Sequence, residues 1–186
     1  MRQTIIPSAI MALSLAACGS PDTDVENDMA MDDMASQAAA SQATADLMTA
    51  DGTPVGTVTV TGDEASDLTV MIEAMDMPPG MHGVHIHTTG ACAPDFTAAG
   101  GHWNPDDSMH GLEGDPGQHA GDMPNLEIGE DGAGVLTYTL AGGATMDGLM
   151  DADGSAFVVH AGEDDQTTDP SGDSGDRIAC GVFEAG

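Results

Sequence analysis

Apolar and polar side chains alternate along much of the chain beyond residue 45, a pattern that predicts short β-strands. The segments V-G-T-V-T-V-T at 55–61 and D-L-T-V-M-I-E at 67–73 each direct every second side chain to one apolar face, as expected of a strand with one buried side. Turn dipeptides such as Asp131-Gly132 and Asp153-Gly154 separate further apolar runs. Additional strands are expected at 45–48, 134–140, 156–160 and 178–183, with a weak one at 144–149. The fold class is therefore predicted to be all-β.

A long segment between His87 and Glu130 shows little periodicity, and loops of that length inside a domain are usually functional or disordered. All seven histidines fall between His82 and His160, and His102, His110 and His119 lie inside this segment. His85 and His87 have the i, i+2 spacing that places two side chains on one face of a strand. Imidazole nitrogens favour copper and zinc, so the segment is predicted to build a transition-metal site.

A single histidine is more often a surface or core residue, so the prediction rests on the order and neighbours of all seven. From about Ala45 to Gly186 the chain resembles the copper,zinc superoxide dismutases, especially their bacterial periplasmic branch. The resemblance is carried by G-V-H-I-H-T-T-G-A-C, A-G-G-H-W-N-P, M-H-G, H-A-G-D-M-P-N-L, F-V-V-H-A-G-E-D-D and T-D-P-S-G-D-S-G-D-R-I-A-C-G-V. It implies an eight-stranded Greek-key β-barrel or sandwich, immunoglobulin-like, with long metal-binding loops.

The resemblance also implies a set of site residues, with one copper and one zinc ion per subunit. The implied copper ligands are His85, His87, His102 and His160. The implied zinc ligands are His102, His110, His119 and Asp122, so that His102 bridges the two metals. Beyond the ligands, Asp164 matches a carboxylate that joins His85 to His110, Arg177 matches an arginine that orients superoxide, and His82 matches a brace for the backbone.

The function implied by the resemblance is dismutation of superoxide to dioxygen and hydrogen peroxide by alternate reduction and reoxidation of copper. In the family the bridging histidine, here His102, leaves copper on reduction and takes up a proton, so His102 and Arg177 are the expected catalytic residues. The alternative is a periplasmic copper-binding or buffering protein with incidental dismutase activity. The enzyme is the favoured hypothesis, because a copper store needs neither a substrate-orienting arginine nor a shared imidazolate.

The N-terminus reads as an export signal. Residues 1–17 contain one arginine followed by an apolar run, and L-A-A-C resembles a bacterial lipoprotein processing site that would leave Cys18 lipidated. A plain secretory peptide is the alternative. With Cys18 used as an anchor, Cys92 and Cys180 remain to form one disulfide in an oxidising compartment, and the family joins the cysteines at these positions. The expected location is the periplasm or cell envelope, with membrane contact only through the lipid.

Residues 18–44 form an acidic segment with few large apolar side chains and are expected to be a disordered tether before a domain at 45–186. Met29, Met31 and Met34 lie among aspartates, and thioethers bind copper(I). A copper-gathering arm is one interpretation, although a solvated spacer is favoured because a short methionine cluster is a weak motif.

The charge balance is extreme: the chain has 32 acidic residues, two arginines and no lysine. After removal of residues 1–17, Arg177 is the only base, and the formal charge is −31. This excludes nucleic acid as a partner and departs from the family, whose corresponding loop commonly carries lysines that attract superoxide. Steering is expected to be confined to a short-range positive pocket, with a rate that stays flat or rises with moderate salt. Monomer and homodimer both remain open.

Overall fold

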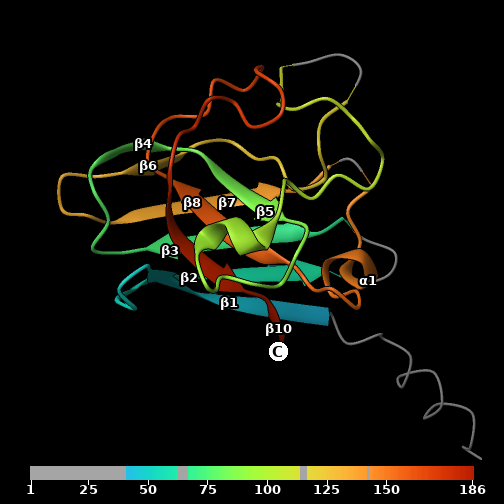
Figure 1. Ribbon diagram of the computed structural model, residues 1–186, viewed down its shortest axis with the longest axis horizontal. Helices are drawn as coiled ribbons and strands as arrows, with labels where there is room; N and C mark the ends of the chain where they lie inside the picture. The colour runs from blue at the N-terminus through green and yellow to red at the C-terminus, as the bar shows by residue number, and fades with distance from the viewer. Residues whose placement is uncertain (1–40, 63–66, 114–116, 142) are drawn as a thin grey trace, which may run out of the picture. The chain divides into compact units, whose positions relative to one another are not determined.

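A computed structural model describes residues 41–62, 67–113, 117–141 and 143–186. The predicted signal peptide, the lipidation site at Cys18 and the three tether methionines lie outside the described residues. Ten strands and two short helices make up the described chain (Figure 1). They are β1 (Ser41–Thr49), β2 (Pro54–Gly62), β3 (Thr69–Ala74), β4 (Gly80–His82), β5 (Val84–His87), the 3-10 helix η1 (Phe96–Ala99), β6 (Leu126–Ile128), β7 (Gly134–Thr139), α1 (Met146–Leu149), β8 (Ala156–His160), β9 (Arg177–Val182) and β10 (Glu184–Ala185).

Eight strands form one antiparallel sheet in the order β5-β8-β9-β1-β2-β3-β7, with β10 pairing to β1. A second, two-stranded sheet pairs β4 with β6. It lies between the two ends of the large sheet, because β4 continues through Gly83 into β5, and β6 turns into β7 through a hairpin in which Gly129 N–H donates to Ala133 O. The strands therefore curl into a barrel, and the neighbours β5-β8, β9-β1 and β3-β7 are crossovers of the Greek-key type. The all-β prediction is confirmed.

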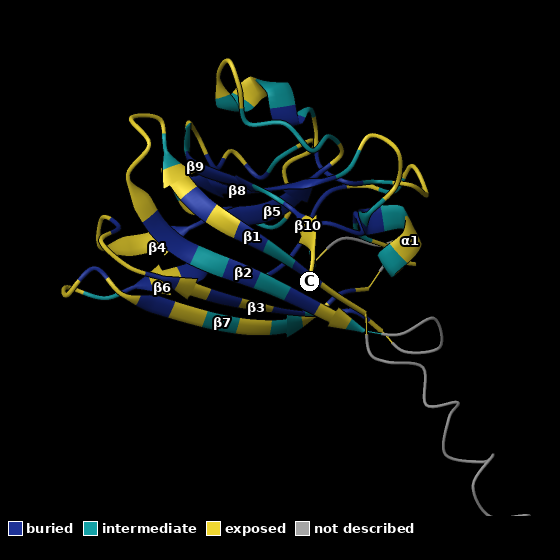
Figure 2. Cartoon of the chain, turned by 90° about the horizontal axis from the view of Figure 1, so that it is seen from below, coloured by how far each residue is buried: buried dark blue, intermediate teal, exposed yellow. Residues whose placement is uncertain are grey.

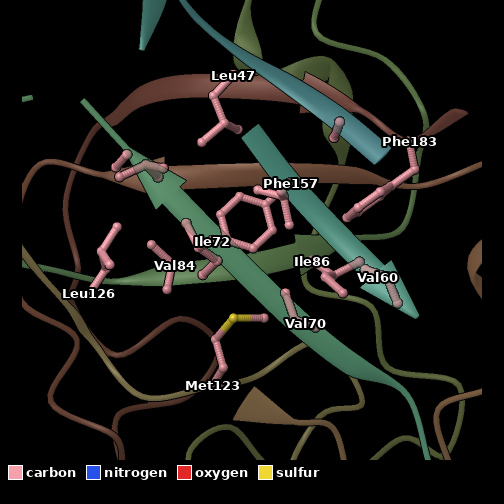
Figure 3. Close-up of a cluster of buried hydrophobic side chains, with 14 of the residues drawn as sticks. Leu47, Val60, Val70, Ile72, Val84, Ile86, Met123, Leu126, Phe157 and Phe183 are labelled. Carbon is pink, nitrogen blue, oxygen red and sulfur yellow. The ribbon is translucent and has the colours of Figure 1, made fainter. Parts of the chain in front are cut away.

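The barrel interior holds the apolar face of each strand. Val58, Val60, Val70 and Ile72, which the alternation places on one side of their strands, are all buried, while the residues between them are partly or fully exposed (Figure 2). Phe157 lies at the middle of the cluster (Figure 3). Each such side chain stabilises the fold by roughly 1.5–3 kcal/mol relative to an exposed one. This core is the rigid support on which the loops rest.

Two local predictions were wrong. The weak strand expected at 144–149 is the helix α1, because the side chain of Thr145 accepts from Gly148 N–H and caps the first turn. The domain also begins earlier than the expected boundary: residues 41–44, assigned to the tether, belong to β1. They pair with β2, and Ala43 is fully buried opposite Val60, so the strand begins four residues before the expected boundary.

Two long loops supply the rest of the site: one lies between β5 and β6, and the other lies between β8 and β9 and runs above the strands in Figure 1. They comprise residues 88–125 and 161–176. In the part of the chain that the structure describes, no helix is long and apolar enough to cross a membrane.

Candidate metal centre

Strands β5 and β8 present the first three histidines of the site. His85 and His87 stand on β5, paired to β8 at Val158 and Ala156, and His160 is the last residue of β8. Single backbone bridges then bring His102 opposite His87 and Asp122 opposite His85. Residues that are far apart in sequence therefore gather on one face of two short, fully buried antiparallel strands.

The four predicted copper ligands lie together. His85, His87, His102 and His160 each place one ring nitrogen so that all four lie within 4.8 Å of one another. Within the described residues, Nδ1 of His85 and Nε2 of the other three are buried and have no hydrogen-bond partner. A buried polar atom without a partner is costly, and four of them around one point are best explained as ligands of an ion. Four imidazole nitrogens suit copper.

The second nitrogen of each of these rings has a partner that fixes the ring. His85 Nε2 lies 2.6 Å from Asp164 Oδ2, while His87 Nδ1 and His160 Nδ1 lie 3.0 and 3.1 Å from the carbonyl oxygens of Gly100 and Gly175. A ring nitrogen that donates to an oxygen leaves the opposite nitrogen with its lone pair free. These contacts therefore direct the unpartnered nitrogens toward a common ion.

The four predicted zinc ligands form a second buried cluster within the same 4.8 Å limit. The Nδ1 atoms of His102, His110 and His119 lie 2.9, 3.1 and 3.2 Å from one oxygen, Oδ1 of Asp122. A tetrahedral zinc ion with bonds of about 2.0 Å separates its ligand atoms by about 3.3 Å, close to these values. The other oxygen, Oδ2, accepts from the backbone N–H groups of Gly111 and His119, so Oδ1 is left for the cluster. Three nitrogens and one oxygen suit zinc.

Two residues connect the clusters. His102 turns Nδ1 toward the zinc cluster and its unpartnered Nε2 toward the copper cluster, and its ring stacks on His85 with centroids 3.8 Å apart. Asp164 is buried and joins His85 Nε2 at 2.6 Å to His110 Nε2 at 3.0 Å through its two oxygens. The arrangement can hold two ions that share the imidazole of His102 as a ligand, while the carboxylate of Asp164 connects one ligand of each ion.

Burial sets the protonation of the copper cluster. It lowers the pKa of His85 to about 3, of His87 to about 2 and of His160 to about 4. These rings are neutral at pH 7, the form that binds a metal. In the zinc cluster burial raises the pKa of Asp122, but hydrogen bonds from His102, His110 and His119 hold it well below its usual range. The carboxylate is therefore ionised and can balance a cation.

Arg177, the first residue of β9, is tied to the loop after β5. Its Nη1 donates to Phe96 O at 2.6 Å and its Nη2 to Gly100 O at 2.7 Å. Gly100 O also accepts from His87 Nδ1, so one carbonyl joins the guanidinium to a residue of the copper cluster. Burial lowers the pKa of Arg177 and nearby Asp95 opposes this, but a guanidinium stays charged at neutral pH. The loop thus holds a fixed cation beside the cluster.

The predicted disulfide is confirmed: Cys92 and Cys180 are joined across 88 residues. It fastens the same loop to β9, three residues beyond Arg177. A hollow of about 870 Å³ runs along this region and is lined by Met48, Phe96, Arg177 and the disulfide, but by none of the histidines. It is therefore not the metal site itself.

His82 lies outside both clusters, as expected. Its Nδ1 is 2.7 Å from His160 O and its Nε2 is 2.8 Å from Pro78 O, so it braces β4 against β8.

Sequence reasoning missed several residues that support the ligands. Asn125 donates to Asp164 O and accepts from Asp164 N–H, both at 2.8 Å. Asp169 Oδ1 accepts from His110 N–H at 2.9 Å, and the carbonyls of Gly100 and Gly175 fix two rings. Asn125 and Asp169 stand inside the quoted motifs, but neither residue type signals a contact with a segment so distant in the chain.

Comparison with known proteins places the chain in one family. Residues 54–183 match the family model described as copper/zinc superoxide dismutase. The chain is 34% identical to the superoxide dismutase-like protein YojM of Bacillus subtilis over 98% of this chain and 96% of the relative. It is 38% identical to a Cu-Zn superoxide dismutase of Caulobacter vibrioides over 72% of this chain and 80% of the relative.

Solved structures agree with the sequence matches. A SOD-like protein from Bacillus subtilis superposes with a TM-score of 0.69 at 39% identity, covering 75% of this chain and 96% of that one. The Cu/Zn superoxide dismutase from Brucella abortus gives a TM-score of 0.64 at 29% identity, covering 77% and 99%. Together with the two linked clusters, these matches show that the chain belongs to the copper/zinc superoxide dismutase family.

Proposed function

We propose that the chain converts superoxide to dioxygen and hydrogen peroxide at a copper ion held by His85, His87, His102 and His160, beside a zinc ion held by His102, His110, His119 and Asp122. The observation that carries the proposal is the convergence of four buried ring nitrogens without partners in the described structure, one of them on a histidine shared with the second cluster. When bound, copper supplies one-electron chemistry and zinc supplies a fixed Lewis acid without redox change.

His102 is the proposed proton carrier. Its Nδ1 is engaged on the zinc side by Asp122, whereas its Nε2 has no partner among the described protein atoms and can hold a proton. The ring is only 8% exposed, so a proton there is delivered within the site and is not lost to bulk water. Peroxide formation from superoxide needs two protons, and this atom provides a place for one of them.

Arg177 is the proposed substrate-orienting residue. Two of its N–H groups are occupied by Phe96 O and Gly100 O, which leaves three of the five guanidinium donors free for an anion. The two carbonyl contacts also hold the charge in place, so little entropy is lost when superoxide binds. A copper store requires no such cation, and its presence supports dismutation over the copper-buffering alternative.

We further propose that the protein acts in the bacterial envelope, anchored through a lipid on Cys18. The export signal at residues 1–17 and the L-A-A-C sequence support this, and the Cys92–Cys180 disulfide suits an oxidising compartment. Labelling of cells with a radioactive fatty acid tests the anchor. The wild type is expected to take up label and Cys18→Ser to lose it; an unlabelled wild type overturns the proposal.

The activity is tested on the purified mature protein after metal analysis, by following superoxide decay for the wild type and for His102→Ala. Near-equimolar copper and zinc in the wild type, with fast decay that the substitution abolishes, supports the bridged dismutase. Copper binding without fast decay in the wild type contradicts it and favours copper handling. Thermal unfolding of both forms in parallel separates a lost proton carrier from a lost fold.

A further inference from the structure

Three backbone hydrogen bonds close a ring between β5 and the loop that follows it. Ile86 N–H donates to Gly121 O at 3.0 Å, Gly121 N–H donates to Trp103 O at 2.9 Å, and Trp103 N–H donates to Ile86 O at 2.8 Å. Each member therefore gives one hydrogen bond and receives one. The three segments that meet in the ring lie 17 or more residues apart, and no regular strand pairing accounts for all three bonds.

Every member of the ring is a sequence neighbour of proposed metal ligands. Ile86 stands between two copper ligands, Trp103 follows the shared histidine and Gly121 precedes the zinc carboxylate. A backbone shift in any member is passed directly to its neighbour, because adjacent α-carbons are held at a fixed separation. The ring thus joins the segments of both clusters through the backbone; the ligands beside it are His85, His87, His102 and Asp122.

The barrel core holds the ring in place. The side chain of Ile86 is fully buried and points into the cluster around Phe157, where Met123 from the zinc segment also packs (Figure 3). Trp103 is 7% exposed and belongs to the same core. Because packed interiors resist displacement, the fold positions the ring.

Gly121 is the position where the ring tolerates no side chain. A Cβ added there would lie 2.3 Å from Ile86 O, whereas real Cβ contacts are essentially never shorter than 3.0 Å. The two segments would have to separate by at least about 0.7 Å, while metal–ligand distances tolerate only about 0.2 Å. Gly101, the residue before His102, offers a contrast, since nothing lies within 4 Å of a Cβ added there.

We propose that the Ile86–Trp103–Gly121 ring sets the spacing between the copper and zinc halves of the centre, and that Gly121 is a positioning residue which this close approach requires. The inference rests on the proposed function, because it concerns the two ions that the clusters would hold. It assigns a role to backbone groups that touch neither metal.

The first experiment compares Gly121→Ala with Gly101→Ala and the wild type. All three are purified, metal analysis is made, zinc affinity is measured by competition with a chromogenic chelator, and the copper(II) signal is recorded by electron paramagnetic resonance. Gly121→Ala is expected to bind zinc at least tenfold more weakly and to show an altered copper(II) signal, while Gly101→Ala matches the wild type. A wild-type zinc affinity and signal in Gly121→Ala overturns the inference, as does a Gly101→Ala with the same defects.

A second measurement needs no variant and decides the matter if Gly121→Ala does not fold. Hydrogen exchange of the wild type is followed by mass spectrometry with both metals and after selective removal of zinc, in peptides that contain Ile86, Trp103 and Gly121. If the ring opens as a unit, zinc removal speeds exchange by a similar factor, expected to be tenfold or more, at all three positions. Faster exchange in the zinc segment alone overturns the inference.

The two experiments separate this inference from the proposed function. If the wild type takes up both metals in equal amounts but the ring experiments give the contrary results, only the inference about the ring is wrong. A wild type that takes up neither metal contradicts the proposed function itself.

Discussion

Replacing Asp164 by asparagine tests how strongly one buried carboxylate supports both metals. The side chain is fully buried, and its two oxygens accept from His85 Nε2 at 2.6 Å and from His110 Nε2 at 3.0 Å. Asparagine keeps the shape but has one oxygen and one NH₂ group, so in either orientation an N–H donor faces an imidazole N–H donor. One histidine of one cluster is then left without its acceptor.

The expected cost follows from that lost acceptor. A buried donor left without a partner costs about 1–3 kcal/mol, and loss of a group that supports a metal ligand typically weakens binding about 10- to 100-fold. The two estimates agree, because a tenfold change is about 1.4 kcal/mol. We expect zinc binding, copper binding or both to weaken by a factor of about 10 to 100 in Asp164→Asn.

The assay is competition for each metal against a chelator of known affinity, with Glu163→Gln as the matched control. Glu163 is exposed and adjacent, so the control removes the same charge without touching a ligand. Wild-type affinities for both metals in Asp164→Asn would refute the reasoning, and so would an equal loss in Glu163→Gln, since the effect would then be one of net charge.

Four other predictions concern the cation, the salt dependence, the disulfide and the pH range. Arg177→Ala should keep wild-type metal content but lose at least about tenfold in the second-order rate of superoxide decay. Arg177→Lys should recover only part of that rate, because lysine keeps the positive charge but lacks the planar fork. The wild-type rate should stay flat or rise as salt increases toward about 0.1 M, and a steep fall in stopped-flow traces would contradict confined steering. The double variant Cys92→Ser with Cys180→Ser should lower the free energy of unfolding in urea by about 4 kcal/mol, because it releases a loop of 88 residues, and an unchanged midpoint would contradict this. In the metal-free protein the pKa values of His85, His87 and His160 are lowered to about 3, 2 and 4, so the stability that these neutral rings contribute is present above pH 6.5 and is lost as pH falls toward 3. His110 behaves in the opposite way. Hydrogen bonds to Asp122 and Asp164 raise its pKa to about 9 in spite of burial, so its contribution to stability is lost as pH rises from 6.5 to 9. Melting temperatures of the metal-free protein should therefore peak near pH 6.5 and fall more steeply on the acid side; a curve that rises steadily from neutral pH into acid would contradict this.

The strands with strong alternation were predictable because burial of one face dictates a period of two. Val58, Val60, Val70 and Ile72 are inside for that reason. Strands β4 and β6 were not predictable, since three residues carry no period and their pairing depends on closing a barrel between distant segments. Alternation also says nothing of helix α1, where a single capping threonine decides the local structure.

The site was predictable in its residue types but not in its support. Histidines and aspartates in family motifs identify possible ligands, and the structure places them in two linked clusters. The Asn125–Asp164 pair joins residues 39 apart, and the backbone ring through Gly121 involves no side-chain donor at all. Contacts of this kind leave no mark on composition or spacing, because any residue has a peptide group and only the fold decides which peptide groups meet.

The scarcity of basic residues has a practical consequence for proteolysis. Trypsin cuts only after lysine or arginine, and beyond Arg2 the sequence has a single such bond, the one after Arg177. That bond lies in β9, with the guanidinium held by two carbonyl oxygens, so the protease can reach it only when the strand and its loop come apart. Trypsin therefore reports a single event in this molecule: how often β9, which carries the proposed substrate-orienting residue, separates from its loop.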